Sequence, residues 1–172
     1  MGLFDFFKSN TDNKTTVLNL KVGDIVEYDL NEYNVLGVVK YQSGGYEWYD
    51  YHLADNQQSL WLYAEQDDRL ELGLFEKLPP SHQLYNKFSQ GYPAAVEYEG
   101  ETFNLIEKDQ AQIAVTGQVG AKSGQQINYA DYQAKEAMIS VERWGSELEI
   151  SIGCSIQENL IEIYPAEESQ HE

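Results

Sequence analysis

The stretch with the clearest chemical character runs from residue 46 to residue 52, where aromatic and acidic side chains alternate and a histidine follows. An aromatic ring stabilises a cation over its face by about 0.5–2 kcal/mol, and a neighbouring carboxylate adds Coulomb attraction. The pattern therefore predicts a site for a polyamine, a Lys- or Arg-rich peptide or a basic partner surface. Cross-strand aromatic packing beside a solvated acidic face is the alternative explanation. The predicted ligand-binding residues are Glu47, Trp48, Tyr49, Asp50, Tyr51 and His52.

Residues that could catalyse a reaction are few. His52 lies two positions after Asp50, so both side chains share one strand face and could form an acid–base couple, although a structural histidine has the same spacing. The sequence contains no nucleophile elbow, phosphate loop, dinucleotide fingerprint or Cys/His cluster with zinc spacing. We therefore expect a domain that is not an enzyme, with no catalytic residue, metal or cofactor. A hydrolase that uses Asp50 and His52, or a chance carboxylate pair, is the alternative.

The chain is strongly acidic, with 29 acidic and 11 basic residues and a net charge of −18. Nucleic-acid binding depends on neutralising phosphates with Lys and Arg, so this charge argues against a nucleic-acid partner. Two interpretations of the charge stay open. It keeps the protein soluble, or it attracts a cationic partner, which would be a protein or a small molecule.

The sequence predicts that the first 16 residues form a segment separate from the domain. The apolar residues could cover one side of a short helix, and a polar linker follows them to residue 16. This amphipathic tip is expected to fold back onto the domain, to contact a protein partner or a membrane interface, or to stay disordered. Its apolar residues are Leu3, Phe4, Phe6 and Phe7.

The compartment follows from the absence of export signals. No apolar run approaches the roughly 20 residues that span a bilayer, so we expect no transmembrane segment. The N-terminus does not resemble a signal peptide. Cys154 is the single cysteine, which fits a reducing compartment, and we predict a cytoplasmic protein. Cys154 lies in an apolar run and is expected to be a buried small hydrophobe, with a reactive thiol as the alternative.

From residue 17 onward the chain is composed of short strand-like segments separated by turns. Tyr, Val and Ile are concentrated in these segments, as is typical of half-buried pleated surfaces. The pattern predicts an all-β fold preceded by the short N-terminal helix. The expected strands lie at residues 24–29, 33–41, 46–53, 59–63, 70–74, 94–98, 102–106, 112–119, 129–134, 137–143, 148–156 and 160–164.

The strand pattern contains an internal repeat. Residues 26–29 recur at 96–99 and residues 33–36 recur at 103–106, both at an offset of 70 positions (96 minus 26), although chance similarity of β-rich segments is the alternative. Two related β-modules would then pack as a sandwich or as partly open barrels. The expected divisions are a tip and linker at 1–16, a first module at 17–80, a connector and second module at 81–164, and an acidic tail at 165–172.

Several motifs together resemble a bacterial family, the domain of unknown function numbered 4178. They are Val22–Tyr28, Trp48–Leu53, Ser59–Leu62, Val96–Gly100, Tyr132 and Ser140–Gly145, and they span most of the chain. Asp50 and His52 depart from the residues expected at those positions. The resemblance implies no established activity. Relatives are often encoded beside membrane-stress proteins and polyamine-synthesis enzymes, so we expect a non-catalytic interaction module linked to a membrane-stress assembly, with a polyamine-binding domain as the alternative.

Overall fold

A computed structural model describes residues 14–120 and 125–167, so the predicted tip with Leu3, Phe4, Phe6 and Phe7, and its helix, lie outside the described residues. The described part is all-β, as predicted. The only helical elements in it are the short helix α1 (Leu84–Lys87) and one 3-10 turn (Glu158–Leu160). The strands are β1 (Ile25–Tyr28), β2 (Asn31–Ser43), β3 (Tyr46–Ala54), β4 (Ser59–Gln66), β5 (Leu70–Lys77), β6 (Ala95–Tyr98), β7 (Glu101–Gly117), β8 (Gln126–Ala134), β9 (Ala137–Trp144), β10 (Glu147–Ile156) and β11 (Ile161–Tyr164).

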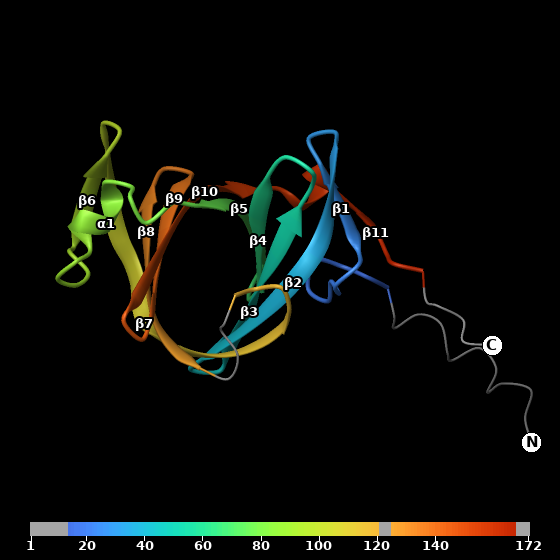
Figure 1. Ribbon diagram of the computed structural model, residues 1–172, viewed down its shortest axis with the longest axis horizontal. Coiled ribbons are helices and arrows are strands. Elements are labelled where there is room, and N and C mark those ends of the chain that lie inside the picture. Colours follow the sequence, from blue (N-terminus) through green and yellow to red (C-terminus); the bar gives the residue numbers. More distant parts are fainter. Residues whose placement is uncertain (1–13, 121–124, 168–172) are drawn as a thin grey trace, which may run out of the picture.

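Eight of these strands close into one antiparallel barrel, in the order β2-β3-β4-β5-β10-β9-β8-β7, with β7 pairing back onto β2. Figure 1 shows this barrel in the centre of the molecule, with β1 and β11 on one flank and β6 and α1 on the other. The prediction of a sandwich or of partly open barrels is therefore wrong. Four barrel strands come from the first half of the chain and four from the second, and the two seams between the halves, β2–β7 and β5–β10, close one shared wall.

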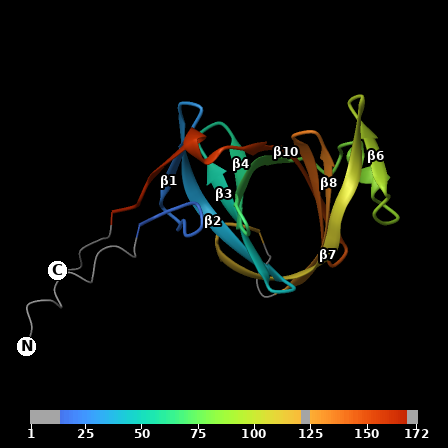
Figure 2. The same cartoon turned by 180° about the vertical axis from the view of Figure 1, so that it is seen from behind.

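The two longest strands each bend out of the barrel at a β-bulge. The register of β2 against β3 shifts between Val35 and Gly37, and that of β7 against β8 shifts between Leu105 and Glu107. A bulge sharpens the local twist and bends its strand. The first part of β2 can therefore pair with β1, and the first part of β7 with β6, outside the barrel (Figure 2).

The core is divided into three clusters rather than one. One cluster joins the outer face of β3 and β4 to β1 and β11, and another joins the outer face of β8 and β9 to α1 and β6. The third contains Trp61, Phe75, Tyr129 and Trp144 on the inner face of the barrel. Because side chains alternate between the two faces of a strand, the two outer clusters support the wall and leave the barrel interior for other side chains.

Cys154 contradicts the expectation of burial, because its side chain is exposed. It shares the outer face of β10 with Ile150, which is fully buried, but it lies near the end of the strand. Apolar character along a strand predicts a shared face, and burial of each residue depends on whether a neighbouring element covers that position.

Glycines close the β2–β7 seam, where Gly37 lies directly opposite Gly117. A Cβ on Gly37 would lie 2.5 Å from the carbonyl oxygen of Gln118, and Gly117 has a φ of +74°. We expect Gly117→Ala to lower the free energy of unfolding by about 2–4 kcal/mol, because the methyl group meets the Leu36 carbonyl in a backbone conformation that disfavours side chains. Urea titration followed by circular dichroism measures the loss.

Gly44→Ala is the matched control for this prediction, since Gly44 also has a positive φ of +55° but nothing within 4 Å of its Cβ position. The control should lose about 1 kcal/mol, from backbone strain alone. Equal losses in both variants would show that the seam tolerates the methyl group.

Candidate functional site

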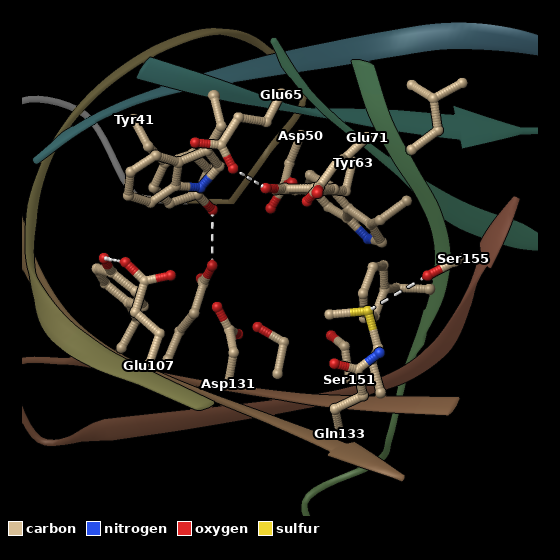
Figure 3. A pocket seen from close by; sticks show the side chains of 18 of the residues that line it. Tyr41, Asp50, Tyr63, Glu65, Glu71, Glu107, Asp131, Gln133, Ser151 and Ser155 are labelled. Atoms are coloured by element: carbon tan, nitrogen blue, oxygen red, sulfur yellow. Dashed lines mark hydrogen bonds between the residues drawn. The ribbon is translucent and has the colours of Figure 1, made fainter. Parts of the chain in front are cut away.

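The barrel interior contains a cavity of about 470 Å³, a volume typical of small-molecule sites. Its lining is unusually acidic for an interior, as the close view in Figure 3 shows. Two cationic side chains, Arg69 and Lys77, line the cavity together with seven carboxyl side chains. The seven are Asp50, Glu65, Glu71, Glu107, Asp131, Glu142 and Glu149.

Strand alternation explains why these carboxyl groups point inward. On β3, Trp48 and Asp50 line the cavity, whereas Tyr49 and Tyr51 lie on the opposite face and pack in the outer cluster. The same alternation on β9 brings Ser140 and Glu142 into the lining, and on β8 it brings in Tyr129 and Asp131. The acidic interior therefore follows from the two-residue alternation of side chains along these strands.

Aromatic rings form one wall of the cavity. Trp48 stacks on Tyr41 with a centroid separation of 5.1 Å and an interplanar angle of 4°. Tyr129 meets the Trp48 ring edge-on at 5.3 Å. Tyr63 and Trp61 from β4 add two further rings to the lining. A cation in this cavity could therefore contact several ring faces.

Two aspartates in the cavity have strongly raised pKa values. Burial, together with smaller contributions from the nearby carboxylates of Glu142 and Asp131, raises the pKa of Asp50 from 3.8 to about 8. Burial, together with repulsion from Glu107 and Glu142, likewise raises the pKa of Asp131 to about 7. Both side chains face the cavity rather than packed atoms, so they are half-buried by area while the surrounding wall excludes bulk water.

Hydrogen bonds orient the other carboxylates. The Tyr41 hydroxyl donates to Glu142 Oε1 over 2.8 Å, and the Trp144 ring nitrogen donates to Glu142 Oε2 over 3.0 Å. The Tyr129 hydroxyl donates to Glu107 Oε1 over 2.9 Å. Tyr41 reaches Glu142 from β2, Trp144 lies on the same strand as Glu142, and Tyr129 lies on β8 beside Glu107 on β7, so donors from three strands orient these two acids.

The carboxyl groups continue to the mouth of the barrel. A second cavity of about 430 Å³ opens there and shares Glu65, Glu107 and Asp131 with the first, so the two spaces are continuous. Asp67 and Asp109 also line this mouth. Burial, together with repulsion from Glu107, Glu71 and Asp67, raises the pKa of Glu65, although a hydrogen bond from Tyr63 opposes the rise. Arg69 lines both spaces as well, with its Nε 3.4 Å from Glu71 Oε1, and carboxyl groups outnumber it along this path.

The predicted ligand-binding residues do not all lie in the cavity. Trp48 and Asp50 line the cavity, while Glu47 is exposed on the outer surface, with its carboxylate 3.3 Å from Lys40 Nζ. His52 stacks on the Trp61 ring, and its two ring nitrogens lie 2.9 Å from the Gln118 carbonyl oxygen and 2.6 Å from Ser59 Oγ. Both nitrogens of His52 are therefore engaged in structural contacts and do not form a couple with Asp50.

Sequence reasoning missed most of the cavity. The residues it did not single out include Tyr41, Lys77, Glu107, Asp131 and Glu142. One signal was present in the sequence beyond the two repeated segments named above: Leu62–Glu65 resembles Ile139–Glu142, which aligns Glu65 with Glu142, and both line the cavity. Among the described residues no group of His, Cys, Asp and Glu side chains is arranged to hold a metal ion.

Comparison with known proteins gives a family but no activity. The model of a domain of unknown function (DUF4178) matches residues 21–158. Uncharacterized proteins of Mycobacterium bovis and Mycobacterium tuberculosis are each 29% identical over 158 residues, covering 84% of this chain and 71% of theirs. No solved structure matches the chain. Neither helical element in the described part of the chain has the length and apolar character needed to cross a membrane.

Proposed function

Because the chain belongs to the DUF4178 family, whose name specifies no activity, we propose a function from the cavity itself: a non-catalytic domain that binds a small alkylammonium ligand, such as a polyamine, inside its barrel. The observation that carries the proposal is the joint lining of carboxyl groups and aromatic faces. Each ammonium group of such a ligand finds both a counter-charge and a ring, the two interactions that stabilise organic cations in proteins.

The energetic argument supports the same ligand class. Burying several carboxyl groups beside one another is unfavourable unless a cation accompanies them. The raised pKa values of Asp50 and Asp131 reflect that cost. An ammonium group beside them would offset it, which favours a cationic ligand. A neutral or anionic ligand would leave the repulsion in place.

The repeat is also part of this proposal. We infer that the halves are related modules, because the bulges after Val35 and Leu105 are separated by the same 70 positions (105 minus 35) as the repeated segments. In each half an Asp-Tyr pair, at 50–51 and 131–132, places the Asp in the cavity lining and the Tyr in an outer cluster. Duplication would thus have given the barrel its two facing aspartates.

We further propose a cytoplasmic location, supported by the single cysteine in 172 residues. Free polyamines and basic peptides are available as ligands in that compartment. The broader role as an interaction module linked to a membrane-stress assembly is compatible with ligand binding in the barrel. Deletion of residues 1–9 tests this role. The shortened protein should no longer recover a partner or be recovered in the membrane fraction, and its binding of spermidine should be unchanged.

Calorimetric titration with spermidine tests the proposed function. We expect one ligand per barrel at pH 8.5 and low salt, with an affinity that falls as salt rises because the contacts are electrostatic. The combined variant Trp48→Ala with Asp50→Asn should weaken binding at least tenfold, since it removes a ring and a carboxylate from the same wall. Glu47→Gln is the matched control, because it removes an exposed carboxylate from the outer face of the same strand.

The control variant should bind spermidine like the parent protein. Equal weakening in the control and in the cavity variant would assign the binding to overall charge rather than to the barrel. Absence of any heat at millimolar spermidine would reject the proposed function.

A further inference from the structure

A lysine of the chain itself already places an ammonium group in the cavity. Lys77 is the last residue of β5, at the β5–β10 seam, and its side chain enters the lining there. Its Nζ lies 4.1 Å from the centroid of the Trp61 ring and 3.2 Å from Glu149 Oε2. The side chain is a four-carbon alkylammonium, the same chemical unit that repeats along a polyamine.

This contact defines a complete subsite for one ammonium group. Trp61 supplies the ring face and Glu149 the carboxylate, and both belong to the cavity lining. Only 9% of Trp61 is exposed, whereas the Lys77 and Glu149 side chains are 34% and 27% exposed, so the ammonium lies between a buried ring and a partly solvated carboxylate. The barrel therefore binds an alkylammonium already, and the one that it holds comes from its own chain.

Lys77 also acts on the remaining acids of the cavity. Its charge lowers the pKa of Asp50, against the larger effects of burial and of Glu142 that raise it. Lys77 and the aspartate wall are thus close enough to interact. A ligand ammonium that approached Trp61 would meet the positive charge of Lys77 directly, whereas one beside Asp50 would meet it as the smallest of the effects that act on that carboxyl group.

We infer that Lys77 is a specificity-determining residue, which fills the Trp61–Glu149 subsite and restricts the ligand to ammonium groups that fit beside Asp50, Asp131 and Glu142. The inference rests on the proposed function and adds a preference for the length of the amine ligand. A short diamine or triamine is accommodated by the aspartate wall and the mouth. A longer tetraamine gains little from its extra ammonium, because the subsite that would take it is occupied.

A series of amines tests this inference. The probes are putrescine, spermidine and spermine, titrated calorimetrically at pH 8.5 into the parent protein and into Lys77→Met, whose unbranched side chain keeps much of the apolar contact without the charge. We expect Lys77→Met to raise the ratio of spermine to spermidine affinity about tenfold, because spermine can then place an ammonium over Trp61. Lys77→Arg retains the cation and should keep the parental ratio.

The outcomes distinguish a failure of the inference about Lys77 from a failure of the proposed amine-binding function. A Lys77→Met protein that binds spermidine with an unchanged ratio would overturn the role of Lys77 and leave the barrel as the ligand site. A parent protein that binds none of the three amines would overturn both. Thermal unfolding verifies that each variant is folded, and Lys77→Gln replaces Lys77→Met if the methionine variant is not.

Discussion

Replacing Asp50 and Asp131 together by asparagine is expected to stabilise the protein without ligand at alkaline pH while strongly weakening its affinity for spermidine. Both aspartates have folded-state pKa values well above the ordinary value of 3.8, at about 8 and about 7. The folded protein therefore holds protons that the unfolded chain releases. Asparagine resembles the protonated acid in shape and never ionises, so it removes the cost of ionisation in the barrel.

The direction of the pH effect follows from proton linkage. A group with a raised folded pKa contributes its full stability below the unfolded value of 3.8 and loses it as the pH rises through the folded value. Each unit between the two values corresponds to about 1.4 kcal/mol once the group is ionised. The parent protein should thus lose several kcal/mol between pH 4 and pH 9, and the double variant should lose much less.

Thermal unfolding of the two proteins at pH 4, 7 and 9 measures this difference. We expect similar midpoints at pH 4 and a midpoint at least about 5 °C higher for the double variant at pH 9. The control is Asp68→Asn with Glu136→Gln, which removes the same charge from exposed positions. A double variant that is less stable than the parent at pH 9 would mean that the aspartates are stabilising anions rather than unfavourable ones.

The affinity for spermidine is expected to rise steeply with pH, by at least tenfold between pH 6 and pH 8.5. At pH 6 both aspartates are protonated and offer no counter-charge, whereas at pH 8.5 most of that charge is present. The primary amines of the ligand stay protonated until about pH 10, as lysine does, whereas the secondary amine, which has ammonium groups on both sides, is protonated at pH 6 and begins to lose its proton toward pH 8.5. Other charged or titratable groups that act on Asp50 from the surrounding strands are Tyr41, Tyr63, Lys77 and Glu142.

Calorimetry in two buffers of different ionisation enthalpy measures the protons released on binding. Near pH 7 the complex should release about one proton or more, because the ammonium lowers the pKa of the aspartates. The double asparagine variant should show weak binding that does not depend on pH in this range. An affinity for the parent protein that stays constant from pH 6 to pH 8.5 would exclude the aspartates from ligand contact.

The fold could be predicted from the sequence as far as local pattern determines it. The spacing of two that puts Asp50 and His52 on one strand face also puts Trp48 there, because strand geometry fixes that relation within a few residues, and Trp48 and Asp50 line the cavity together. The closure of the sheet was not predictable in the same way. It depends on β2 meeting β7 and on β5 meeting β10, contacts between distant parts of the chain that no short pattern encodes.

The same reasoning explains which part of the site was missed. Asp50 belongs to a conspicuous aromatic and acidic stretch, but Asp131 and Glu142 lie in ordinary strand sequences among 29 acidic residues. They become significant only when the barrel brings them to Asp50. Lys77 is a similar case, because its role depends on Trp61 and Glu149, which come from two other strands.

The central claim is that the interior of the barrel, and not its acidic exterior, holds an organic cation. Nuclear Overhauser contacts between unlabelled spermidine and isotope-labelled protein at pH 8.5 test it most directly. The account predicts contacts from the ligand methylene protons to ring protons of Trp48, Tyr63 and Tyr129, which line the cavity. Saturable binding whose contacts involve only side chains on the outer surface would contradict it.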